Sequence, residues 1–210
     1  MNSKEIITLA KEVISQETAA AAAIADQVDE SMVRAAELML ACTGHVLVAG
    51  SGTSHLVGAR LAHLLSCCGT PSLFIDPGDA QHGLSGAVMG SDVLIAISKG
   101  GTTTEVNHLA HFAKQRGAKV IALTEKPDSP LGQISDVVLK VVSPVEVDPY
   151  GMIATGSSLI NSTFCDALCV VMLKLRGYSK EEFAKTHPGG AVGIQLKKDN
   201  ILLNEIGGRK

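Results

Sequence analysis

Short apolar runs that alternate with helical patterns constrain the fold of this chain more than any other feature of its sequence. The runs are rich in β-branched residues and cover 45–50, 72–75, 93–97, 119–123 and 137–141, while helical spacing covers 54–67, 102–116, 129–134 and 155–175. Strands without polar alternation are buried on both faces, as in parallel sheets joined by right-handed helical crossovers. The sequence therefore predicts an α/β protein, a three-layer α/β/α sandwich with a five-stranded parallel sheet.

A chain of 210 residues is long enough for one large domain, and no linker, repeat or charge block divides it. Residues 1–42 have apolar positions at helical spacing and an alanine-rich run, 19–25, which predicts two N-terminal helices. These helices form either an arm that packs on the core or on another subunit, or a plain surface pair. Residues 43–196 are expected to form the ligand-binding part, and 197–210 a tail too short for a further domain.

Composition excludes several classes of partner. The formal net charge is −3 and aromatic residues make up 3% of the chain, so neither a basic face nor stacking platforms for nucleic acid are expected. Residues 1–5 are too polar for a signal peptide, and no apolar run approaches the ~20 residues of a membrane span. We expect a soluble protein without membrane or nucleic-acid partners.

The five cysteines indicate a reducing compartment. They are odd in number, four of them lie in apolar helical stretches, and none has metal-ligand spacing to a histidine. We expect buried free thiols in a cytoplasmic protein. The residues are Cys42, Cys67, Cys68, Cys165 and Cys169.

Two similar loops, 50–54 and 98–104, join a predicted strand to a predicted helix and contain glycine together with Ser or Thr. In a parallel sheet, ligands bind beyond the carboxyl ends of the strands, and glycine-rich turns before helices favour phosphate. Ordinary helix capping explains either loop alone, but two in one sheet favour a phosphate site. The spacing of a dinucleotide-binding fingerprint fails, because His55 stands where the third glycine should be, and the Walker motif is absent.

Aldose–ketose isomerisation needs a base for a proton on the carbon beside a carbonyl, and an acid for the sugar oxygens. Glu105 follows the second loop by about one helical turn, and Glu146 lies in a loop after another strand. His82 and His187 lie in glycine-containing segments, which favours a site over a core position for each.

These features resemble the SIS (sugar isomerase) domain family, and within it the arabinose 5-phosphate isomerase branch. Residues 98–103 resemble the family's phosphate loop, and the resemblance extends from about residue 13 to residue 196. The paired CBS modules that often follow in that family are not found in this sequence. The other matching segments are 69–71, 79–83, 96–98, 105, 154–158, 166–168, 176–178, 183–184 and, most specifically, 187–193.

The resemblance implies roles for individual residues. Glu105 resembles the family's catalytic base, His187 and His82 its ring-opening and proton-shuttling histidines, and Glu146 a further catalytic acid. Thr53 occupies a catalytic position at which family members have lysine. The implied phosphate and substrate contacts are Ser51, Gly52, Ser54, Gly69, Thr70, Ser98, Lys99, Gly100, Thr102 and Thr103. The family also implies a homotetramer in which helical arms and a histidine of one subunit complete a neighbour's site.

The sequence departs from the family pattern at three positions, and each departure leads to a hypothesis. Thr53 removes a cation from the first loop, whereas Lys99 stands in the second loop where the family usually has Asn, so we hypothesise that Lys99 compensates. Asp76 stands where some members have a histidine able to bind metal. Because a lone carboxylate is a poorer zinc ligand, we expect no required metal and no other cofactor, although binding at Asp76 and His82 is left open.

The sequence therefore favours an isomerase that converts arabinose 5-phosphate to ribulose 5-phosphate through a cis-enediol. A catalytically silent sugar-phosphate sensor is the alternative from a different class, because the loss of lysine at position 53 leaves binding without turnover. An isomerase of a hexulose or heptulose phosphate is the alternative among enzymes.

Overall fold

A five-stranded parallel sheet forms the centre of the molecule in the computed structural model, which describes residues 1–143, 146–199 and 201. The strand order is β2-β1-β3-β4-β5. Every residue of β1 and β3 is buried, as expected for strands covered on both faces. The predicted sheet is confirmed. The strands are β1 (Val46–Gly50), β2 (Ser72–Phe74), β3 (Val93–Ile97), β4 (Lys119–Thr124) and β5 (Val137–Lys140).

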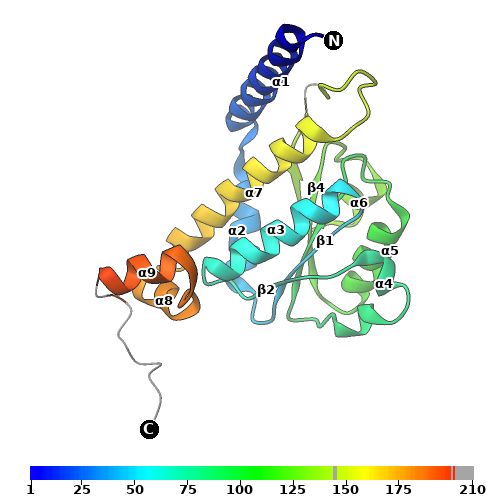
Figure 1. Ribbon diagram of the computed structural model, residues 1–210. Coiled ribbons are helices and arrows are strands. Elements are labelled where there is room, and N and C mark those ends of the chain that lie inside the picture. The colour runs from blue at the N-terminus through cyan, green and yellow to red at the C-terminus, as the bar shows by residue number, and fades with distance from the viewer. Residues whose placement is uncertain (144–145, 200, 202–210) are drawn as a thin grey trace.

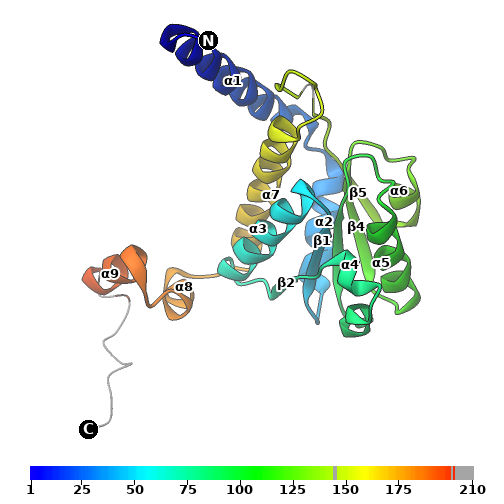
Figure 2. The same ribbon diagram turned by 45° about the vertical axis from the view of Figure 1, so that its right-hand side comes forward.

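Helices cover both faces of the sheet, which confirms the three-layer prediction (Figures 1 and 2). Successive strand residues point to opposite faces, so Val46 and Val48 join the core with α2, α3 and α7, whereas Leu47 and Ala49 join the core with α4, α5 and α6. The helices are α2 (Glu30–Ala41), α3 (Thr53–Cys67), α4 (Pro77–Ala80), α5 (Thr104–Gln115), α6 (Pro130–Ile134) and α7 (Thr155–Leu175). The short 3-10 turn η2 (Leu84–Ala87) follows α4.

The two N-terminal helices differ in their packing. Helix α1 (Ser3–Ala23) has no buried residue and projects from the body of the molecule, with its main contacts to α7 and to the turn that follows α1 (Figure 1). After a 3-10 turn, η1 (Ile24–Gln27), helix α2 buries Met32 and Met39 in the core. The projecting arm is therefore α1 alone, with Ile6, Ile7, Leu9 and Ile14 exposed.

Helix α7 has the length and hydropathy of a membrane-crossing helix, with a mean hydropathy of 1.5. This overturns the expectation that no apolar run approaches that length. The apolar residues Ile160, Phe164 and Leu168 belong to the core, and Asp166 pairs with Arg60 of α3. The central position of α7 in its layer accounts for its composition.

Two short helices that the sequence analysis did not predict, α8 (Lys180–Thr186) and α9 (Gly190–Lys198), follow at the far end of α7 (Figure 2). The expected boundary at residue 196 falls inside α9. Of the expected tail, 197–210, residue 200 and residues 202–210 lie outside the described part of the chain.

Candidate phosphosugar site

The two glycine-containing loops leave the sheet side by side. Gly50, the last residue of β1, pairs in register with Ile97, the last residue of β3, so Ser51 and Ser98 follow neighbouring strand ends. Chain order reverses between these strands because β2 lies on the outer side of β1, which makes this the topological switch point where α/β sheets bind ligands. The structure therefore places both predicted phosphate loops at one edge.

Hydrogen bonds hold the second loop in a tight turn. The buried Ser98 hydroxyl lies 2.9 Å from the Thr103 hydroxyl, and the Asn107 amide donates to the carbonyl of Gly101 at 3.2 Å. Gly101 has a φ of +65°, and a Cβ there would lie 1.9 Å from the hydroxyl of Ser129, so only glycine fits. This turn brings hydroxyls together with the first amides of α5, a combination suited to an anion.

Glu105 lies in the first turn of α5, half-buried, with its carboxylate beside the first loop. Its own backbone N–H and the Ser51 hydroxyl lower its pKa, and His108 contributes in the same direction, whereas burial and the charge of Asp76 oppose the shift. The net pKa is lowered, so Glu105 is a carboxylate at neutral pH. The candidate base is thus ionised next to the junction of the two loops.

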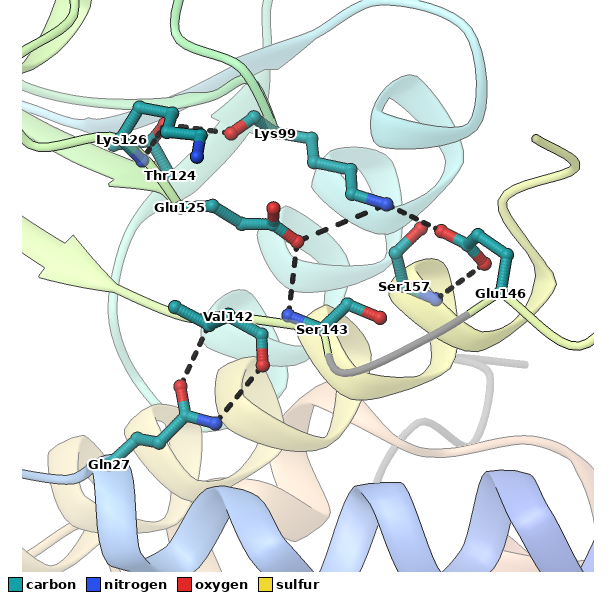
Figure 3. A network of polar contacts seen from close by, with 9 residues as sticks. All are labelled: Gln27, Lys99, Thr124, Glu125, Lys126, Val142, Ser143, Glu146 and Ser157. Carbon is teal, nitrogen blue, oxygen red and sulfur yellow. Dashed lines mark hydrogen bonds and ion pairs between the residues drawn. The ribbon is translucent and has the colours of Figure 1, made fainter. Parts of the chain in front are cut away.

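A second cluster of carboxylates surrounds the side chain of Lys99 from the second loop (Figure 3). Glu146, which is 8% exposed, accepts a hydrogen bond from Lys99 Nζ at 2.7 Å and one from the Ser157 N–H at 3.2 Å. Lys99 Nζ also lies 3.9 Å from Glu125 Oε1, which accepts from the Ser143 N–H at 3.0 Å. Burial raises the pKa of Glu146, but the Lys99 and Ser157 bonds outweigh it, so the net pKa is lowered.

Figure 3 also shows that the end of the N-terminal region is tied to this cluster. The Gln27 side chain donates to the carbonyl of Val142 at 3.0 Å and accepts from its N–H at 2.7 Å. Val142 precedes Ser143, the residue that binds Glu125. Sequence reasoning missed both Gln27 and Glu125, because only the fold brings them to the loop.

The remaining loop residues line the same edge. Gly52 precedes α3 with a φ of +61°, Thr53 is exposed at the first position of that helix, and Ser54 is partly buried. Gly100 and Thr102 are exposed in the second loop. His82 lies just after α4, on the loop that follows β2, and its side chain is exposed.

Three residues of the predicted site are not brought to this edge. Gly69 and Thr70 precede β2 and lie at the amino ends of the strands, where Thr70 accepts a 2.8 Å hydrogen bond from Arg176 and Gly69 packs on Tyr178. His187 follows α8, beyond the end of α7, with its ring stacked 3.8 Å from the ring of Phe183. Helix α7 begins beside Glu146 and is about 30 Å long. Because His187 follows the other end of this helix, it lies far from Glu146 within one copy of the chain.

His55 is a candidate that sequence reasoning noticed only as a missing glycine. It lies in the first turn of α3, and its Nδ1 is 3.3 Å from Oδ2 of Asp76, the residue that caps α4. The sequence signal that could have identified His55 is its position directly after the first predicted phosphate loop, 50–54.

A cavity of about 340 Å³ opens between α4, η2 and α5, lined by Ala80, Gln81, Ser85, His108, Leu109 and Phe112. His108 lies one turn along α5 from Glu105, so the cavity adjoins the candidate base. Within residues 1–143, 146–199 and 201, no group of three His, Cys, Asp or Glu side chains could hold a metal ion. The expectation that no metal is required stays a prediction.

The fold and the site define a doubly wound α/β protein with an anion-binding cradle at its switch point and an ionised carboxylate beside it. Residues 39–171 match the SIS domain model, and the chain belongs to this family. It is 36% identical over 200 residues to the arabinose 5-phosphate isomerase KdsD of Pseudomonas aeruginosa, an alignment that covers 94% of this chain and 61% of that protein. The chain thus spans about three fifths of the length of that relative.

Two solved structures are also similar to this chain over most of its length. A candidate sugar-phosphate isomerase from Listeria monocytogenes superposes with a TM-score of 0.87 at 34% identity, over 90% of this chain and 100% of the other. The c3406 protein of Escherichia coli CFT073, solved in complex with arabinose 5-phosphate, superposes with a TM-score of 0.86 at 28% identity and the same coverage.

Proposed function

We propose that this chain isomerises a phosphorylated aldose to its ketose, with arabinose 5-phosphate and ribulose 5-phosphate as the pair. The observation that carries the proposal is the ionised Glu105 beside Ser51, at the junction of two loops suited to phosphate. The relative named as an arabinose 5-phosphate isomerase and the neighbour solved with that sugar phosphate support this choice of sugar.

In the proposed reaction, the phosphate anchors the open-chain sugar, and Glu105 removes the proton from C2. The electron pair forms the C1–C2 double bond of a cis-enediol while the aldehyde oxygen receives a proton. Glu105 then returns its proton to C1, and the C2 hydroxyl loses its proton as the ketone forms, so protons and electrons balance. The proposed phosphate contacts are the hydroxyls of Ser51, Ser54, Ser98, Thr102 and Thr103, together with the amides of Gly52 and Gly100.

The second cluster has a different proposed role. Glu146 is buried and already bonded to Lys99, so we assign it to fixing the ammonium beside the second loop. Lys99 then supplies the positive charge that Thr53 does not, next to the phosphate or the enediolate. Because Gly69 and Thr70 lie at the other edge of the sheet, we assign them to packing against the segment after α7.

We further propose a homotetramer that acts in the cytoplasm. His187 can reach a candidate site only from another copy of the chain, and the unburied α1 offers apolar residues for such contacts. The five free cysteines, of which Cys165 and Cys169 are buried, suit a reducing compartment. Mass measurement in solution tests the tetramer.

The test of the function is a turnover and thermal-shift screen against aldose and ketose phosphates of five, six and seven carbons. We expect turnover of arabinose 5-phosphate and stabilisation by about 2.7 kcal/mol at a ligand concentration 100 times Kd. Stabilisation without turnover of any sugar would instead indicate the sensor. Absence of both would overturn the proposal.

A further inference from the structure

A histidine–aspartate pair lies at the carboxyl edge of the sheet, and its histidine is outside the set of residues that the family resemblance supplied. His55 on α3 faces Asp76 on the loop after β2, with Nδ1 and Oδ2 3.3 Å apart. The two side chains are 41% and 40% exposed, so the pair is open to a ligand. It spans the gap between the ends of β1 and β2.

Both members of the pair are held in place by other contacts. Asp76 Oδ1 accepts from the N–H groups of Gly78 and Asp79 at 2.8 and 3.1 Å, which turns Oδ2 toward the imidazole. The His55 ring lies against Phe74, with centroids 4.3 Å apart and planes inclined at 52°. With Nδ1 against the carboxylate, Nε2 has no hydrogen-bond partner among the described residues.

Asp76, one member of the pair, also lies near the candidate base. The charge of Asp76 acts on Glu105 and opposes the lowering of its pKa by Ser51. The described contacts of His187 are instead with its own helix, at the far end of α7. His55 is therefore, with His82 and His108, one of the imidazoles that this chain itself brings to this edge, and its ring is the one paired with Asp76.

We propose that His55, oriented by Asp76, opens the sugar ring before isomerisation. In this step Nε2 takes the proton of the anomeric hydroxyl, whose oxygen forms the C1=O double bond while the C1–O4 bond breaks. The same proton passes from Nε2 to O4, so the imidazole ends as it began and the product is the open-chain aldehyde. The inference rests on the proposed function, because it assigns a residue to the first step of that reaction.

The decisive variant is His55→Gln, with His63→Gln as the matched control on the same helix. His63 is exposed two turns further along α3 and contacts only Cys67, at 3.7 Å, in the described hydrogen-bond network. We expect kcat on arabinose 5-phosphate to fall at least ~100-fold for His55→Gln, with KM within about threefold, and little change for His63→Gln. A loss below about threefold for His55→Gln would overturn the proposal.

A substrate that cannot cyclise separates ring opening from a structural defect. The 4-deoxy analogue of the aldose phosphate has no hydroxyl with which to close a furanose ring. We expect His55→Gln to turn over this analogue within about threefold of the unmodified protein. Equal losses on both sugars would exclude ring opening as the role of His55.

Asp76→Asn tests the positioning role, because asparagine keeps the oxygen that caps α4 but removes the charge facing His55. We expect a smaller loss of kcat, roughly tenfold, on the cyclic sugar only. Loss of Asp76→Asn activity on both sugars, or a change in KM alone, would contradict the role.

Turnover by the unmodified protein tests the proposed function separately from the role of His55. If that protein turns over no sugar, the isomerase proposal fails, and His55 is then judged by the NMR signal of its ring, assigned with His55→Gln. A shift of this signal on addition of arabinose 5-phosphate, but not of inorganic phosphate, would support contact with the sugar. An unchanged signal in a protein that binds the sugar would overturn the inference.

Discussion

The two carboxylates that flank the second loop, Glu105 and Glu146, lie in opposite surroundings. Glu105 is half-buried on a helix, is stabilised by neutral donors, and has the like charge of Asp76 nearby. Glu146 is buried, and its oxygens already accept from Lys99 and from a backbone N–H. A carboxylate bonded to an ammonium is a weaker base, because protonation removes the charge that the ammonium stabilises. The comparison therefore supports the proposed division of roles, with proton transfer by Glu105 and electrostatic anchoring by Glu146.

The largest expected effect is that of Glu105→Gln, which preserves shape but removes the base. We expect kcat to fall at least ~100-fold, because proton-transfer residues typically contribute that much, with little change in affinity. Turnover assays together with isothermal titration of the sugar phosphate measure both. Similar losses for Glu105→Gln and Glu146→Gln would break the proposed division of roles.

Glu146→Gln is expected to have a smaller effect on turnover but a clear one on stability. Lys99 would lose its main partner while glutamine still accepts from Ser157, so we expect about a tenfold loss of kcat and a loss of about 1–2 kcal/mol in unfolding free energy. Glu125→Gln is the control, because its carboxylate lies 3.9 Å from Lys99 Nζ rather than 2.7 Å.

The same variant carries a pH test. Because the pKa of Glu146 is lower in the folded chain, its contribution to stability is present above the ordinary value of 4.5 and is lost as the pH falls through the folded pKa. Unfolding by urea at a series of acidic pH values should therefore show a weaker loss of stability for Glu146→Gln. An unchanged pH dependence would mean that Glu146 is not held as a carboxylate.

Lys99→Met tests the role of the Lys99–Glu146 pair from the lysine side. Methionine keeps the length of the side chain but removes the charge, so we expect roughly a tenfold loss of kcat/KM if Lys99 replaces the missing cation. Lys126→Met is the control, an exposed lysine two residues beyond Thr124, whose hydroxyl donates to the Lys99 carbonyl. Unchanged turnover and substrate affinity in Lys99→Met would reject compensation.

The sheet and the position of the two loops could be predicted because both depend on local patterns. The run 93–97 and its register partner 46–50 are wholly apolar, and parallel strands place their following loops at one edge. The direction of the Lys99 side chain could not be predicted, since Glu146 lies 47 residues away and is brought there only by folding.

The misplacement of Gly69 and Thr70 had a signal in the sequence. Both residues precede a predicted strand, and segments before parallel strands lie at the edge opposite to the loops that follow them. The match of residues 69–71 to the family motif did not reveal this position, because a motif match takes no account of strand direction. The position of His187 could not be predicted, because it depends on the direction in which α7 crosses the sheet. Helix α7 places the segment that follows it at the amino ends of the strands, beside Thr70.

The smallest expected effect distinguishes the two serine hydroxyls of the first loop, those of Ser51 and Ser54. The Ser51 hydroxyl lowers the pKa of Glu105, second only to the backbone N–H of Glu105 itself, so Ser51→Ala should raise that pKa. The acidic limb of the kcat/KM profile should then move to higher pH, with at most a few-fold change at neutral pH, where Glu105 stays ionised. Ser54→Ala removes a proposed phosphate contact without touching Glu105, and should raise KM while leaving the limb in place. If both variants moved the limb equally, the shift would come from phosphate binding, and the Ser51 hydroxyl would have no special link to Glu105.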